Sequence, residues 1–197
     1  MKALIHFLLV LVLIGSSLIS SAQSNPRASS RSAAQYDAAS IDENIADNRD
    51  VIYFSQMAID RSSTAETKDI ARDMLTDFTG LLYSMEQLAT AGGSGNKGGA
   101  GNSTSQAARE LNAQLAVSRG FSFDTAWIGG VLRMHQVKMD ELTEQKANAT
   151  NERLKAAISE AMPVLKRYIT RLNTLQKQMI RRDLQAKKEA AKQQQKK

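Results

Sequence analysis

The segment LKAAISEAMPVLKRYITRLNTLQKQM, residues 154–179, decides the fold because it carries an apolar residue at every third or fourth position. This spacing places the apolar side chains on one face of an α-helix, which has about 3.6 residues per turn. The apolar positions are Leu154, Ile158, Met162, Leu165, Ile169, Leu172, Leu175 and Met179. Pro163 falls inside the pattern, and we expect it to kink or restart the helix because proline lacks an N–H. A helix with one apolar face needs other helices to cover it.

Three other long segments have the same period, and a shorter one lies between the second and the third. The predicted helices span residues 36–61, 64–91, 104–117 and 124–146, before the helix that starts near residue 150. The glycine-rich stretch 92–101 is predicted to be a flexible linker, since it lacks the GK[ST] ending and the preceding strand of a phosphate-binding loop. The sequence thus predicts an all-α protein, an antiparallel four-helix bundle with an extra short helix and a long C-terminal helix.

The composition suits one globular domain: 197 residues, 42% hydrophobic and 23% charged, with no cysteine. Residues 1–22 combine a basic start, a short apolar run and a small-residue end, as in a secretory signal peptide. The alternative for this segment is an uncleaved membrane anchor. Residues 23–34 are then a flexible leader, and residues 35–176 form the bundle. We expect an exported protein, periplasmic or associated with the outer membrane, and soluble after the signal is cleaved.

The end of the chain, residues 177–197, holds eight basic residues and only two acidic ones. The apolar period fades there, which predicts a basic tail that is helical or disordered. In an exported protein such a tail can contact an anionic surface of the envelope. The alternative is a solvated helix end that binds nothing, and we expect no nucleic-acid partner because the rest of the chain is nearly neutral. The residues of the candidate contact are Lys177, Arg181, Arg182, Lys187, Lys188 and Lys192.

Five short motifs occur in the order in which they mark one bacterial family. They are DVIYFSQMA (50–58), ARDMLTDFT (71–79), FDTAW (123–127), MHQ (134–136) and MPVL (162–165). Over residues 36–175 the chain therefore resembles an exported family of ferritin-like four-helix bundles of unknown function. Members of that family are often labelled membrane or outer-membrane proteins. The resemblance implies a ferritin-like arrangement of the predicted bundle.

The resemblance also implies where a metal site would lie. The family typically carries an acid in the first helix, an Asp-His pair in the second, and one histidine in each of the last two. The corresponding positions here are Asp50, the pair Asp77-Phe78, His135 and, at or near the last position, Tyr168. Two of the three histidines implied by the resemblance are absent. The candidate metal ligands that remain are His135, Asp77 and Asp50.

The residues themselves argue against a dinuclear ferritin-type site, which uses a Glu-x-x-His motif on each of two helices. Outside the signal segment the only histidine is His135, and Leu132 stands three positions before it. A zinc site lacks thiols and a second imidazole. We expect His135 to be buried and hydrogen-bonded to Asp50 or Asp77 from a facing helix, with metal ligation or acid–base chemistry as the alternatives.

These observations favour an exported, non-enzymatic helical-bundle protein with a binding or structural role in the cell envelope. No motif indicates a catalytic residue or a cofactor, and we expect neither. The alternative function is that of a metal-binding, ferritin-like oxidoreductase or a metal store.

Overall fold

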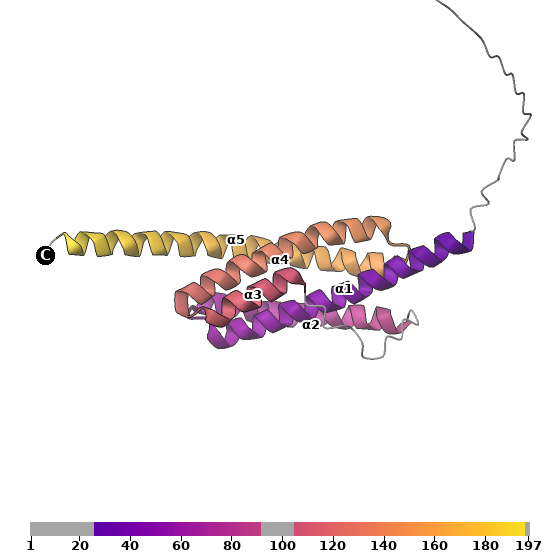
Figure 1. Cartoon of the computed structure of the whole chain (residues 1–197), viewed down its shortest axis with the longest axis horizontal. Coiled ribbons are helices and arrows are strands. Elements are labelled where there is room, and N and C mark those ends of the chain that lie inside the picture. Colours follow the sequence, from indigo (N-terminus) through magenta and orange to yellow (C-terminus); the bar gives the residue numbers. More distant parts are fainter. Residues whose placement is uncertain (1–25, 92–104, 196–197) are drawn as a thin grey trace, which may run out of the picture.

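The computed structural model describes residues 26–91 and 105–195, with side chains from residue 33 onward. These residues form five helices and no strand. The helices are α1 (Pro26–Arg61), α2 (Ala65–Ala91), α3 (Gln106–Val117), α4 (Gly120–Asn148) and α5 (Glu152–Gln194) (Figure 1). The prediction of an all-α bundle with an extra short helix and a long C-terminal helix is confirmed. The predicted signal peptide and the glycine-rich linker lie outside the described residues. In the described ranges, no helix has the length and apolar character needed to cross a membrane.

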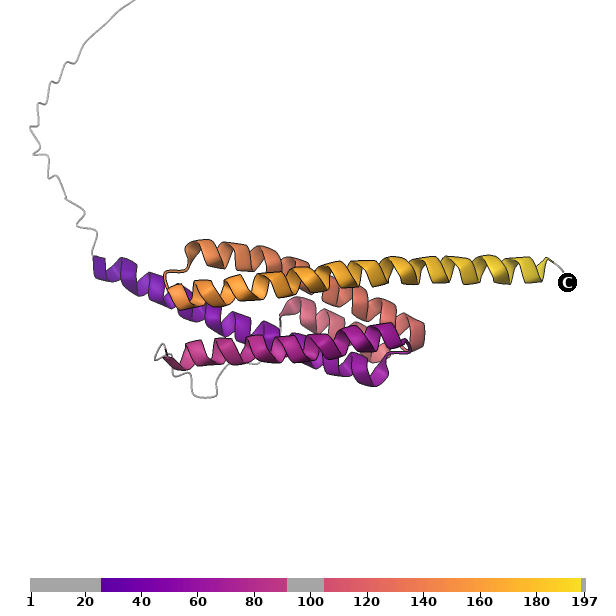
Figure 2. The ribbon, with the colours of Figure 1, turned by 180° about the vertical axis from the view of Figure 1, so that it is seen from behind.

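The four long helices pack as two antiparallel pairs. Short turns join α1 to α2 and α4 to α5, while further contacts join α2 to α5 and α1 to α4 (Figure 2). The short helix α3 packs on α4. Trp127, Tyr168 and Phe54 are among the largest fully buried side chains. The Trp127 indole donates a hydrogen bond to the carbonyl oxygen of Phe54 at 2.8 Å, which ties α4 to α1 through the core.

Two helix starts differ from the sequence prediction. Helix α1 begins at Pro26, well before residue 36, so much of the predicted leader is helical. Proline suits a first helical position because the N–H that it lacks would have no partner there. Helix α4 begins at Gly120, whose φ of 52° is readily adopted by glycine. The buried carboxylate of Asp124 then accepts hydrogen bonds from the N–H and hydroxyl of Ser63, which fastens α4 to the α1–α2 turn.

Helix α5 is longer than the bundle that it helps to form. It continues through Pro163 as one helix. The predicted restart at Pro163 is therefore wrong. Its buried apolar face ends at Met179. Beyond that residue most side chains are exposed, and Figure 1 shows this end of the helix projecting past the other helices.

Candidate functional site

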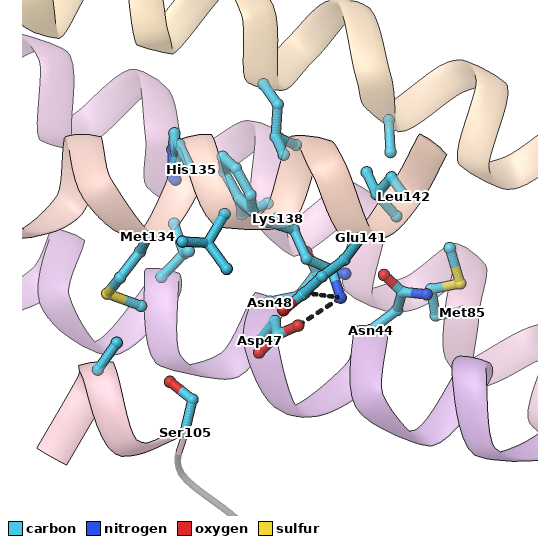
Figure 3. A pocket seen from close by; sticks show the side chains of 16 residues that line it. Asn44, Asp47, Asn48, Met85, Ser105, Met134, His135, Lys138, Glu141 and Leu142 are labelled. Carbon is cyan, nitrogen blue, oxygen red and sulfur yellow. Dashed lines mark ion pairs between the residues drawn. The ribbon is translucent and has the colours of Figure 1, made fainter. Parts of the chain in front are cut away.

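A cavity of about 90 Å³ lies between the long helices and is called the central cavity below. All four long helices and the residues at the start of α3 contribute to its walls (Figure 3). The polar residues of the wall come mostly from α1 and α4, and include Asn44, Asp47, Asn48, His135, Lys138 and Glu141. The apolar residues include Val51, Phe78, Met85, Leu142, Ala161 and Leu165. The central cavity therefore joins a charged side to an apolar interior.

Asp47 and Glu141 of the charged side lie close to a third acid, Glu43, and we call these three residues the acidic cluster. Glu43 and Asp47 lie four residues apart on α1, so helix geometry puts them on one face. One oxygen of each carboxylate lies within 4.8 Å of the other two. The Lys138 ammonium is 2.5 Å from an oxygen of Asp47 and 3.3 Å from an oxygen of Glu141 (Figure 3). Two carboxylates thus pair with the Lys138 ammonium, and the third, that of Glu43, lies beside those two.

A chain of amides holds Glu43 in place. The Asn44 side chain donates to the Gln145 carbonyl oxygen at 2.8 Å, and the Gln145 amide donates to a Glu43 oxygen at 2.8 Å. Asn44 and Gln145 are both buried. Because Gln145 accepts with its carbonyl oxygen and donates with its amide nitrogen, the chain fixes the direction in which the Glu43 carboxylate lies relative to α4.

Burial and mutual repulsion disfavour the charged forms of two acids near the central cavity. Burial raises the pKa of Glu141, and the nearby Lys138 only partly offsets this, while Asp47 and Glu43 raise it further. Burial also raises the pKa of Asp50 to about 6. A hydrogen bond from the Ser105 backbone opposes this rise, and the nearby charge of Asp47 adds to it. One buried oxygen of Asp50 has no hydrogen-bond partner. A further positive charge in this region would therefore favour the ionised forms of both acids.

His135 is buried, with an exposed fraction of 1%, and its Nε2 has no hydrogen-bond partner. Burial lowers its pKa to about 3, so the imidazole is neutral in the folded protein near neutral pH. The expected hydrogen bond to Asp50 or Asp77 is absent among the described side chains, and that prediction is wrong. Asp77 instead accepts hydrogen bonds from Tyr168 and Arg167 of α5. Asp50 accepts from the backbone at Ser105.

The positions at which the family resemblance implies histidines do meet in space. We call Phe78, His135 and Tyr168 the ring cluster. The ring centres are 5.2 Å apart for Phe78 and His135, 6.0 Å for Phe78 and Tyr168, and 6.3 Å for His135 and Tyr168. With two phenyl-type rings in place of imidazoles, the ring cluster serves as packing between α2, α4 and α5. Among the described residues, the candidate ligands Asp50, Asp77 and His135 do not lie close enough together to share one metal ion.

The acidic cluster was missed by sequence reasoning, which singled out only Asp50 nearby. A signal was present: Glu43 and Asp47 lie four apart, and Lys138 and Glu141 lie three apart. Such spacing usually marks exposed faces, where charged residues support a helix through neighbouring turns. Here those faces turn toward each other, and the Lys138 side chain retains only 12% of its exposure.

The six basic residues of the candidate contact all lie on helix α5. Arg182 forms an ion pair with Glu66 of α2 at 2.8 Å. Lys187 forms one with Asp183 at 2.6 Å, one turn away on the same helix. For the other four residues of the candidate contact, no ion pair with a described residue occurs: Lys177, Arg181, Lys188 and Lys192.

Comparison with known proteins gives a family and a fold. Residues 22–175 match the model of a family described as a domain of unknown function (DUF4142). A solved structure of "CopM in the Cu(II)-bound form" is similar, with a TM-score of 0.60 and 16% identity over 72% of this chain and 96% of that chain. At that identity the similarity concerns the fold alone. No curated protein matches the sequence.

Proposed function

The chain belongs to the family described as a domain of unknown function (DUF4142), and from that premise we propose that it is an exported, non-enzymatic binding protein that holds a divalent cation at the acidic cluster. The observation that carries the proposal is the excess of negative charge at the acidic cluster, where three carboxylates lie together and the one ammonium group of Lys138 pairs with two of them. Like charges that are partly withdrawn from water repel one another strongly. A divalent cation relieves this repulsion more fully than the single charge of a lysine.

The chemistry of the ligands favours a hard cation. Carboxylate oxygens are preferred ligands of Mg²⁺, Ca²⁺ and Mn²⁺. Because a water molecule occupies about 30 Å³ in the liquid, the central cavity, at about 90 Å³, has room for an ion that keeps some of its water. His135 lies in the wall of the same cavity with a free Nε2, which offers a hydrogen-bonding group to such water.

Two further observations bear on the proposal. The similar solved structure is a copper(II)-bound form of CopM, which supports cation binding by a bundle of this fold through analogy of fold. The export that we propose rests on the signal-like residues 1–22. A ferritin-like oxidoreductase centre has less support, because His135 is the only histidine in the described part of the chain and packs between Phe78 and Tyr168.

The test is a titration of the chain from residue 23 onward with Mn²⁺, followed by the electron paramagnetic resonance signal of the free ion. We expect one Mn²⁺ per chain, with a Kd of about 0.1 to 1 mM, as in exposed extracellular cation sites. Asp47→Asn should weaken binding by about tenfold or more. Lys138→Met should tighten it by about tenfold, because the competing ammonium is removed while the carboxylates remain.

Matched controls lie on the same two helices. Asp60→Asn removes an exposed acid of α1, and Lys146→Met removes an exposed base of α4, so neither should alter Mn²⁺ binding. If Lys138→Met lowers stability, Mn²⁺ should restore its melting temperature more than it raises that of the wild type. Absence of binding by both the wild type and Lys138→Met, or equal binding by Asp47→Asn, would refute the proposed site.

A further inference from the structure

The projecting end of α5 presents a surface that the bundle does not use. Ile180 and Leu184 have exposed fractions of 50% and 53%, which is high for large apolar side chains. Both lie beyond Met179, the last buried residue of the helix. The neighbouring residues that have no ion pair in the described chain are basic: Lys177, Arg181, Lys188 and Lys192.

Helical geometry places these residues on one face. With a rotation of about 100° per residue, Ile180, Leu184 and Ala191 fall within about 40° of one another. Four basic residues follow on one side of this strip, in the order Lys177, Lys188, Arg181 and Lys192. On the other side lies Lys187. The whole face covers about 140° of the helix, and we call it the basic apolar face.

The acids of this end of α5 lie outside the basic apolar face. By the same rotation of about 100° per residue, Asp183 and Glu189 fall beyond its two edges. The buried residues Leu172, Leu175 and Met179 lie on the opposite side of the helix. The basic apolar face therefore turns away from the bundle, over a length of about 22 Å from Lys177 to Lys192.

We propose that the basic apolar face binds an anionic lipid surface, with α5 lying parallel to the plane of the membrane. A helix with an apolar strip beside basic residues lies in the headgroup region and buries the strip in the upper acyl chains. Lys and Arg reach the phosphates from there, because their long aliphatic stems can lie along apolar surface while the charge stays in water. The apolar strip distinguishes this partner from nucleic acid, because a duplex is bound through its phosphates by basic residues and a single strand also by stacking aromatic rings.

The orientation follows from the contacts of α5. Because the bundle packs on the side of α5 opposite the basic apolar face, a bound membrane meets none of the other four described helices along this segment. Arg182 belonged to the predicted contact, but its ion pair with Glu66 holds it on the bundle side. We therefore leave it out of the basic apolar face and assign binding to the four unpaired basic residues and the apolar strip.

The test is cosedimentation of the chain from residue 23 onward with vesicles of phosphatidylcholine alone or with about a third phosphatidylglycerol. We expect binding to the anionic vesicles only, and a loss of about tenfold or more at 1 M salt, where the Debye length is about 3 Å. The variant Lys177→Gln/Arg181→Gln/Lys188→Gln/Lys192→Gln should lose binding by about tenfold or more, since each basic residue near an anionic surface contributes. Ile180→Ser/Leu184→Ser should weaken binding while leaving its dependence on salt in place.

The matched control removes four exposed basic residues from other parts of the bundle. It is Arg133→Gln/Lys146→Gln/Arg153→Gln/Lys166→Gln, which changes the net charge equally and should bind as the wild type does. Circular dichroism checks that each variant keeps its helices. Equal losses in the two quadruple variants would show that net charge alone acts and would overturn the proposal. Binding to duplex DNA but not to anionic vesicles would also overturn it.

Discussion

The buried imidazole of His135 predicts a specific loss of stability in acid. Its pKa falls from 6.5 to about 3 on folding because burial disfavours the charged form. The unfolded chain therefore takes up a proton below about pH 6.5, while the folded protein resists it, so stability falls as the pH drops from 6.5 toward 3. At about pH 4.5, two units below the unfolded pKa, the loss is about 2.7 kcal/mol, at about 1.4 kcal/mol per unit.

The measurement compares the wild type with His135→Phe, which keeps a ring between Phe78 and Tyr168 and removes the titration. Urea unfolding, followed by the fluorescence of the buried Trp127, gives the free energy of unfolding at about pH 7 and pH 4.5. Asp50 also titrates here: its raised pKa makes the folded protein gain stability as the pH falls below about 6. That gain occurs in both proteins and cancels in the difference between them.

The wild type should lose about 2 to 3 kcal/mol more than His135→Phe between the two pH values. Any cost of fitting the larger ring is independent of pH and cancels as well. His135→Leu is a second non-titrating variant that guards against an effect peculiar to phenylalanine. If both variants show the same dependence on pH as the wild type, His135 is not buried as a neutral group and the reasoning is refuted.

Three further predictions concern the ring cluster and packing. Phe78→His/Tyr168→His should create a site for Zn²⁺ or Cu²⁺, since three imidazoles on one ion have ring centres about 5 to 6 Å apart. Calorimetry should detect one metal ion per chain. Either single variant should bind the metal far more weakly. Gly130→Ala should lower the free energy of unfolding by about 1 to 3 kcal/mol, because its new methyl group would lie 2.3 Å from a methyl group of Leu111 on α3. Gly80→Ala, with open space around the new methyl group, should raise the free energy of unfolding by about 0.5 to 1 kcal/mol. If thermal unfolding shows that both glycine variants shift the melting temperature in the same direction, this account is contradicted.

The fold could be predicted from the sequence because each helix carries a complete apolar face. The eight apolar positions between Leu154 and Met179 set the direction in which α5 faces the core, and of these Leu154, Ile158, Leu165, Leu172, Leu175 and Met179 are buried. The start of α1 was harder to predict, since residues 26–35 are small and polar and lack an apolar period. Their helix continues from the packed part of α1, and Pro26, which suits a first helical position, is the local feature that agrees with its beginning.

The candidate site could be predicted only in part. The family resemblance pointed to Phe78, His135 and Tyr168, and these residues do converge, yet the partner expected for His135 was wrong. Asp77 reaches across to α5, and this depends on the register of α2 against α5 rather than on spacing along one helix. The acidic cluster depends in the same way on the register of α1 against α4. A period of 3.6 residues defines the face of one helix but does not determine which residues of two faces meet.

The ammonium of Lys138 has a consequence for selectivity if the acidic cluster binds a cation. Because it is tethered to α4 within 2.5 Å of Asp47, it competes at an effective concentration that is set by the fold and does not change with the surroundings. Sodium and potassium ions carry the same single charge and lack this tether, so they displace it poorly even when abundant. Only a cation of higher charge density can take its place, and the lysine thereby acts as a threshold that the solution concentration of such a cation must exceed.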